Sequence, residues 1–267
     1  MRVLTVLTYY RPHTSGLTLY AQRLATAQTQ RGHEVTVLTT RHEHGLPTES
    51  EEAGVRVVRT PVWFRLGKGV ISPILYFRAA SLIRHHDVVL LHLPQFDGAG
   101  IALLARLRGV PLVVTYHCDL LLPPGLSNRL VNAVMWMADR ITGTLAAAVV
   151  AYTEDFAAHS PFLRRFAGKC RTVLPPVPPL SAAPAPLPEV AEHIHSAPIL
   201  GMATRFASEK GIEILLDALP TIERQHPGVK VLFAGQYQDV WGEQTYLEKL
   251  LPRIRVLQEQ GRWRFLG

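Results

Sequence analysis

The sequence predicts an α/β fold built on parallel sheets. Short apolar runs alternate with helical patterns through the first 175 residues, and the alternation starts again at Pro198. Strands and helices that alternate in this way are typical of parallel sheets. Several of the runs are continuous Val/Leu stretches, as expected for strands that helices cover on both faces.

The first part of the chain should form a complete Rossmann-like domain. Its expected strands are 2–8, 34–40, 55–60, 87–92, 111–116, 147–152 and 170–174, and its expected helices are 16–31, 72–86, 98–108, 127–143 and 155–166. Arg31, Gly32 and His33 supply the basic residue and the glycine that commonly end a helix.

A proline-rich segment separates this part from the rest. Seven prolines lie between Pro175 and Pro188, and such a composition favours a stiff linker. We therefore expect a first domain at 1–175, a linker at 176–197 and a second domain at 198–267. The last has expected strands at 199–203, 230–234 and 263–266 and helices at 211–226 and 242–260, which is too few for a doubly wound domain. We expect it to be the incomplete first part of a second Rossmann-like domain.

Positive charge is concentrated in the first part of the chain. The net charge is +7, yet residues 1–180 hold 19 Lys/Arg against 11 Asp/Glu while residues 181–267 hold 9 against 10. This asymmetry suggests an anionic partner for the first part. No recognition helix, zinc finger or aromatic-basic sheet motif is present, so we expect no nucleic acid. An anionic membrane surface or a phosphorylated acceptor fits better, and an arginine-rich surface without a ligand is the alternative.

Neither a membrane span nor a metal site is expected. The apolar segments are too short or too interrupted by charge to cross a bilayer, and the N-terminal run is too short for a signal peptide. Cys118 and Cys170 lack metal or redox spacing. We therefore expect a cytoplasmic protein, with peripheral attachment at the inner face of the membrane left open. Three pairs of histidines could suggest a zinc site, but no carboxylate or cysteine at ligand spacing accompanies them, which argues against zinc. The pairs are His42/His44, His85/His86 and His193/His195.

The most informative motif is Arg205-x-x-x-x-Lys210-Gly211, which lies between an apolar strand and an amphipathic helix. Backbone amides and the helix dipole favour an anion at a helix N-terminus. Two cations beside that terminus make a diphosphate the natural ligand. The alternative is that Arg205 and Lys210 are solvated loop charges.

A second segment, 61–68, mixes aromatic and basic residues: Trp63, Phe64, Arg65 and Lys68. Such a mixture suits a membrane interface. A lipid-linked acceptor would explain both this segment and the basic first domain. An ordinary packed loop would have the same composition.

In this order the motifs resemble those of a family 4 glycosyltransferase of the GT-B fold. Similar segments are 15–25 with 31–39, His92-Leu93-Pro94, 115–119, 138–141 and 173–176, in addition to the Arg205–Gly211 motif. The resemblance covers nearly the whole chain. It implies a retaining transfer of a sugar from a nucleotide-diphosphate sugar to an acceptor hydroxyl on a glycan or lipid-linked acceptor, in cell-envelope or extracellular polysaccharide synthesis, with no metal or other cofactor.

The resemblance also implies roles for particular residues. Arg205 and Lys210 would bind the donor diphosphate, and Gly16 would let backbone amides approach a phosphate or the acceptor. His117 would be the catalytic residue that faces the transferred sugar, and Gly235 would line the nucleotide pocket. The family often has two glycines where this chain has Ser15 and Gly16, so the donor contact at that loop is less secure.

One departure from the family concerns a pair of glutamates, spaced by seven residues, late in its second domain. No residue of this chain can be assigned to either of them, and we expect the chain to be a truncated, inactive fragment of the enzyme. A non-catalytic membrane- or glycolipid-binding module is the alternative function. A nicotinamide-dependent oxidoreductase is disfavoured because no glycine-rich phosphate turn follows the first strand. His117 could instead be a structural histidine, and Asp119 could assist the acceptor or cap the loop after it.

Overall fold

The computed structural model describes residues 1–66, 69–120, 125–177, 198–240 and 242–267. The chain forms two compact units, Met1–Pro179 and Leu180–Gly267, and each is described by itself. The predicted linker at 176–197 lies almost entirely outside the described residues.

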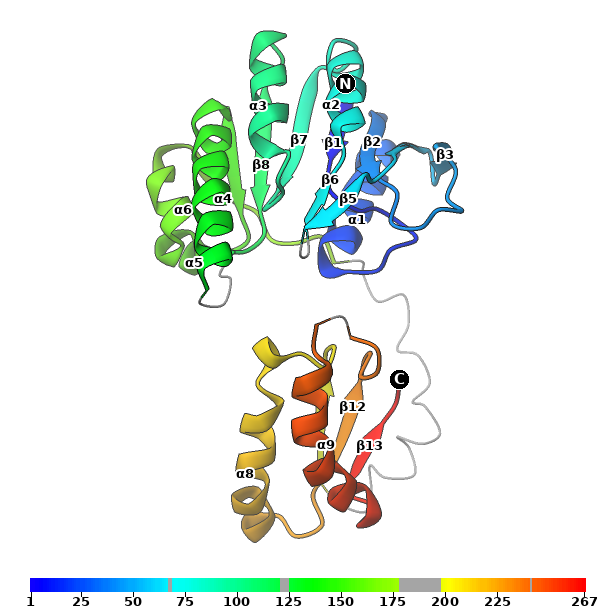
Figure 1. Cartoon of the computed structure of the whole chain (residues 1–267), viewed down its shortest axis with the longest axis vertical. Coiled ribbons are helices and arrows are strands. Elements are labelled where there is room, and N and C mark those ends of the chain that lie inside the picture. The colour runs from blue at the N-terminus through cyan, green and yellow to red at the C-terminus, as the bar shows by residue number, and fades with distance from the viewer. Residues whose placement is uncertain (67–68, 121–124, 178–197, 241) are drawn as a thin grey trace. The chain divides into compact units, whose positions relative to one another are not determined.

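The first unit is built on an eight-stranded sheet with the order β10-β9-β8-β7-β1-β2-β4-β3 (Figure 1). Every pairing is parallel except that of the edge strand β3 with β4. The strands are β1 (Arg2–Val6), β2 (Glu34–Thr40), β3 (Glu49–Glu52), β4 (Val55–Thr60), β7 (Val88–Leu93), β8 (Leu112–Tyr116), β9 (Ala148–Ala151) and β10 (Cys170–Thr172).

Helices cover both faces of this sheet. On one face α1 (Gly16–Gln30) buries Ala21 and Ala25 against the strands. On the other face lie α2 (Pro73–Ile83), α3 (Gly98–Leu107), α4 (Leu126–Leu145), α5 (Glu154–His159) and α6 (Pro161–Arg165), with a short 3-10 turn at Ala167–Lys169. Successive residues of β1 alternate between the two cores: Val3 faces α1, and Leu4 and Val6 face the helices on the other side.

The second unit has three parallel strands in the order β11-β12-β13. The strands are β11 (Ile199–Ala203), β12 (Lys230–Ala234) and β13 (Trp263–Phe265), and the helices are α8 (Ile212–Gln225) and α9 (Gln244–Glu259), with a 3-10 turn at Ser208–Lys210. Phe206, Phe233 and Trp263 form the centre of its core.

The α/β prediction is confirmed, with three local corrections. The helix expected at 155–166 is two helices, because Ser160 is extended and caps α6, which begins at Pro161. The sequence analysis also missed β3 and the hairpin of β5 (Phe64–Leu66) and β6 (Gly69–Ile71). β3 is the edge strand of the large sheet and the hairpin forms a two-stranded sheet of its own, and neither has the continuous apolar pattern of buried parallel strands.

Arg59 on β4 anchors this edge. Its side chain is 2% exposed and pairs with Glu52 on β3 at 2.7 Å. It also donates to Ser50 Oγ at 2.7 Å and to the Arg11 carbonyl at 3.0 Å, which ties the loop after β1 to the sheet. Because Arg59 is buried and fully engaged with these partners, its role is to stabilise the fold.

We expect Arg59→Ala to lower the free energy of unfolding by about 3 kcal/mol, because removing one partner leaves buried polar groups unpaired. Arg56 on the same strand is the matched control, since it pairs with Glu49 but is 55% exposed. Arg56→Ala should cost less than about 1 kcal/mol. Urea unfolding measures both losses, and equal losses would contradict the structural role given to Arg59.

Candidate functional site

The carboxyl edge of the large sheet contains a topological switch point beside β1. The chain leaves β1 through α1 to pair β2 on one side, and β7 later pairs β1 on the other side. Connections that diverge at such a point leave a crevice beyond the strand ends, where open α/β sheets bind ligands. The loop before Gly16, the end of β7 at Leu93 and His117 after β8 all lie along this edge.

Gly16 is the first residue of α1 and is exposed. Ser15 caps the helix: its hydroxyl accepts from the Thr18 amide at 3.2 Å, and Thr18 Oγ1 accepts from the Ser15 amide at 2.8 Å. A methyl group added at Gly16 would meet no atom within 4 Å. Packing therefore does not explain this glycine, and the space over the helix N-terminus is open to a ligand.

His117 is the centre of a network that the sequence did not reveal. Its Nε2 lies 2.8 Å from Nδ1 of His92, the next-to-last residue of β7, and its Nδ1 is hydrogen-bonded to the Tyr152 hydroxyl after β9. The Tyr20 ring of α1 packs edge-on against both histidine rings. Both ring nitrogens of His117 are therefore engaged within the protein.

Burial keeps both imidazoles neutral at neutral pH. It lowers the pKa of His117 to about 4, and burial together with the neighbouring His117 lowers the pKa of His92 to about 3. A neutral ring has one donor and one acceptor nitrogen, so the hydrogen bonds from Tyr152 through His117 to His92 run in one direction. A ligand hydroxyl that bonds to His117 Nδ1 must take the place of the Tyr152 hydroxyl.

The two roles predicted for Asp119 were to assist the acceptor or to cap the loop after it, and its hydrogen bonds in the structure indicate a third. Its Oδ1 accepts from the Tyr116 hydroxyl at 3.0 Å and from Ser160 Oγ at 2.8 Å. It thus ties the end of β8 to the start of α6. Nearby Asp139 is buried, and burial with the charge of Asp119 raises its pKa to about 7.

In the second unit, Arg205 and Lys210 lie on the loop between β11 and α8. Phe206 between them is buried in the core, and its amide donates to the Gln236 carbonyl at 2.7 Å. Arg205 pairs with Glu209, and the two side chains are each 45% exposed. Lys210 is exposed, and its amino group has no hydrogen-bond or ion-pair partner among the described residues.

The N-terminus of α8 is less open than the sequence suggested. Gly211 adopts a left-handed conformation with φ 64° before the helix, and the Ile212 amide donates to the Tyr246 hydroxyl at 3.0 Å. Tyr246 in turn donates to Glu213, whose carboxylate occupies the first turn. The Ser208 amide donates to Glu243 at 2.9 Å. Any anion here would depend on the two cations more than on helix amides.

Gly235, after β12, has a steric reason to be glycine. Its φ is 137°, and a Cβ there would overlap the carbonyl oxygen of Thr204, the residue before Arg205. The Thr204 amide donates to the Ala234 carbonyl at 2.9 Å. This close backbone approach fixes the loop that carries Arg205.

Gly235→Ala should therefore destabilise the second unit by more than about 1 kcal/mol, because alanine is strained at this φ and collides with backbone. Gly201→Ala on β11 is the control, since a methyl group there would meet nothing within 4 Å. Hydrogen exchange of the amides of β11 and β12 reports the stability of this unit. Equal protection in the two variants would contradict the steric argument.

The partners of the predicted residues come from distant segments. Tyr152, Glu243 and Tyr246 were not singled out, and His92 was noted only within a motif. Its position at a strand end on the ligand-binding edge is the signal that could have marked it. The described residues contain no group of three or more His, Cys, Asp or Glu side chains placed to hold a metal. Within the same residues, no helix is long and apolar enough to cross a membrane.

Comparisons with known proteins agree with this architecture. The crystal structure of Anabaena Alr3699/HepE in complex with UDP-glucose superposes with a TM-score of 0.69 at 18% identity, covering 100% of this chain and 69% of that one. A glycosyltransferase from Rickettsia africae ESF-5 gives 0.65 at 18%, covering 100% and 68%. Sucrose-phosphate synthase from Thermosynechococcus elongatus gives 0.64 at 16%, covering 100% and 70%. No curated protein sequence matches the chain.

The two units thus have the architecture of a GT-B glycosyltransferase, as the sequence predicted. The model of the glycosyl transferase 4-like domain matches residues 15–176, more than half of the chain. The chain belongs to this family.

Proposed function

We propose that this chain is part of a retaining glycosyltransferase. The enzyme would move a sugar from a UDP-sugar to an acceptor hydroxyl in the synthesis of a cell-envelope or extracellular polysaccharide or of a glycolipid. UDP is the proposed nucleotide because the HepE structures are described with UDP-glucose and with UDP and glucose. A trehalose-phosphate synthase described as UDP-forming is also similar, with a TM-score of 0.63 at 13% identity. We expect no metal cofactor.

The observation that carries this proposal is the loop of Arg205 and Lys210. The buried side chain of Phe206 and the close approach of Gly235 to Thr204 hold its backbone, while both cationic side chains extend into solvent. Cations on a rigid loop stabilise a diphosphate without a cost of reorganisation at the moment of reaction. Their attraction grows as negative charge develops on the leaving diphosphate, so they would accelerate sugar transfer as well as bind the donor.

The other predicted residues take roles at the crevice of the first unit and beside the loop of the second. Gly16 leaves room over the N-terminus of α1 for a phosphate or the acceptor. His117 faces the transferred sugar as a neutral hydrogen-bonding group, and its two ring nitrogens are hydrogen-bonded to Tyr152 and His92. Gly235 lines the nucleotide pocket and positions the Arg205 loop.

The test is calorimetric titration of the purified chain with UDP and UDP-glucose. Arg205→Ala and Lys210→Ala should each weaken UDP binding about tenfold or more, the typical loss when a charge-assisted hydrogen bond is removed. Arg224→Ala is the matched control, because Arg224 is exposed at the other end of α8. Equal affinities in all three variants would show that the diphosphate does not bind this loop.

Binding is the chosen measurement because this chain spans 69% of the HepE chain. We expect no sugar transfer by the chain alone, since neither glutamate of the family's late pair can be assigned in it.

One surface of the first unit supports the hypothesis of a membrane-bound acceptor, and it would equally support the alternative of a membrane-binding module. The outer side of the α2–α3–α4 layer exposes large apolar side chains, and those of Leu130, Val134, Met137 and Ile141 recur at helical spacing along α4. Trp136 lies under the Arg140 guanidinium at 4.3 Å. Phe77 on α2 and Leu103 and Leu107 on α3 are also exposed, and α3 lies between α2 and α4 (Figure 1).

The exposed charged residues of α2, α3 and α4 are all positive. The three helices contain Arg78, Arg106, Arg129 and Arg140, and Asp139, their one acidic residue, is buried. Apolar groups interspersed with arginine are complementary to an anionic lipid surface. We propose that the α2–α4 layer lies against the inner face of the cytoplasmic membrane. Trp63 and Phe64 are also well exposed, and their membrane contact stays a prediction.

Sedimentation with phosphatidylglycerol vesicles tests this surface. Leu130→Ser with Met137→Ser should lower the partition coefficient about tenfold, since each change removes apolar area that would be buried in lipid. Ile214→Ser on α8 is the control, because Ile214 is equally exposed but lies between Glu213 and Asp217. Equal partitioning of all variants would exclude this face. Vesicle binding without any UDP binding would support the binding module.

A further inference from the structure

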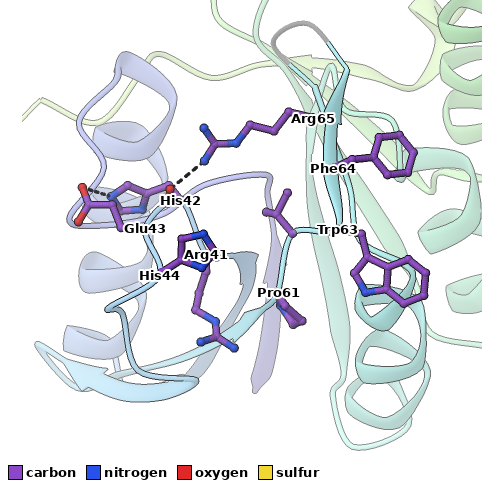
Figure 2. A pocket seen from close by; sticks show the side chains of 9 residues that line it. Arg41, His42, Glu43, His44, Pro61, Trp63, Phe64 and Arg65 are labelled. Carbon is purple, nitrogen blue, oxygen red and sulfur yellow. Dashed lines mark hydrogen bonds and ion pairs between the residues drawn. The ribbon is translucent and has the colours of Figure 1, made fainter.

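A pocket of about 630 Å³ lies beyond the ends of β2 and β4, apart from the His117 network. It is lined by the segment 41–44 after β2 and the segment 61–65 that follows β4 and enters β5 (Figure 2). Its volume lies within the range typical of small-molecule sites. None of the roles proposed above uses it.

The charged groups that line the pocket are mainly cationic. Arg41 and Arg65 come from the two lining segments, and Glu43 is the single acidic residue of the lining. Figure 2 shows the Arg65 side chain extending toward His42, whose carbonyl accepts from Arg65 Nη2 at 2.8 Å. Glu43 is 71% exposed and its carboxylate pairs with His42 at 3.4 Å. Neither arginine has a carboxylate partner among the described residues.

Two buried nitrogens, one in the lining of the pocket and one behind His42, lack a hydrogen-bond partner among the described residues. Arg41 Nε and His13 Nδ1 are buried without a hydrogen bond to any described residue. His13 lies on the loop after β1, and its ring centroid is 5.3 Å from that of His42. Burial lowers the pKa of both histidines, the positive charge of Arg65 lowers both further, and the carboxylate of Glu43 raises both. A buried donor such as Arg41 Nε is rarely left without a partner, and an anion bound beside Arg41 would supply one.

This chemistry fits an anion better than a metal ion. Arginine cannot ligate a cation, and its planar guanidinium matches the oxygens of phosphate. The loop that contributes Tyr9 and His13 continues directly into Ser15 and Gly16 at the start of α1. An anion in this pocket would thus lie against the same loop that leads to the proposed acceptor crevice.

We propose that the pocket of Arg41 and Arg65 binds a phosphate group carried by the acceptor. The phosphate identification rests on the residues of the pocket, and only its assignment to the acceptor rests on the proposed glycosyltransferase function. The phosphate accepts hydrogen bonds from the Arg41 guanidinium, the positive charge of Arg65 adds to the attraction, and the remaining volume accommodates the sugar or headgroup that bears the phosphate.

The test uses the full chain with Arg205→Ala and Lys210→Ala as background, so that the diphosphate loop does not contribute. Glucose 1-phosphate is titrated by calorimetry, and phosphatidic acid vesicles are offered by sedimentation. Arg41→Gln and Arg65→Gln should each weaken binding about tenfold or more. Arg31→Gln, which removes an exposed arginine at the C-terminus of α1, should leave it unchanged.

Binding of glucose 1-phosphate that depends on Arg41 and Arg65 identifies a soluble phosphate ester. Dependence seen only with phosphatidic acid vesicles identifies a lipid headgroup, and both results support the pocket. Binding that is unchanged in Arg41→Gln and Arg65→Gln, or absent with both probes, overturns it. If either variant fails to fold, histidine ring NMR of the wild-type chain decides, because phosphate must shift the His13 and His42 signals.

The proposed UDP site at Arg205 and Lys210 and the proposed phosphate site at Arg41 and Arg65 can be disproved independently. UDP binding that is lost in Arg205→Ala but retained in Arg41→Gln supports the donor loop whatever the outcome at the pocket. Phosphate binding that requires Arg41, in a chain that does not bind UDP, would retain the pocket and remove its assignment to an acceptor.

Discussion

The central position of β1 determines where this protein can bind ligands. β1 pairs β2 on one side and β7 on the other. The connection from β1 leads to β2 and that from the neighbouring β7 leads to β8, so the two diverge from adjacent carboxyl ends and a crevice remains between them. The loop after β1 serves both sides of this point. The rings of its Tyr9 and His13 contact His42, which lines the pocket beyond β2. The loop ends where α1 begins at Gly16, and the Arg59 guanidinium donates to the carbonyl of its Arg11.

A comparable constraint acts in the second unit, although the chemistry differs. There the backbone of Gly235 approaches Thr204 too closely for any side chain, and Phe206 fills the core beneath the loop. Both features restrict the backbone that precedes and follows Arg205. The charge of Glu213 and the Tyr246 hydroxyl already occupy the first turn of α8. The side chains of Arg205 and Lys210 are therefore the groups of this loop that would bind an anion, and at Arg205 the anion would have to compete with the paired Glu209 carboxylate.

The sequence predicted the buried strands well because their apolar runs reflect a local requirement. Residues 34–40 and 55–60 were expected as strands, and β2 and β4 have these bounds. The acidic β3 was missed because its pairing depends on Arg56 and Arg59 of β4. The motifs likewise located His117 at a strand end. They could not show that His92 and Tyr152 occupy both nitrogens of its ring, since those contacts join residues 25 and 35 positions away in the chain.

The arginines of the first unit fall into groups that the net charge alone cannot separate. Arg59 is buried, and its charge is neutralised by Glu52 and by a hydrogen bond to a backbone carbonyl, so it does not bind ligands. Arg41 and Arg65 line a pocket without a carboxylate partner among the described residues, and the exposed arginines of the α2–α4 layer lie among apolar side chains. A cation contributes to binding only where the protein has not already neutralised it. Part of the excess positive charge of this unit therefore lies at two surfaces, the pocket of Arg41 and Arg65 and the α2–α4 layer, for which a phosphate and an anionic membrane are the proposed partners.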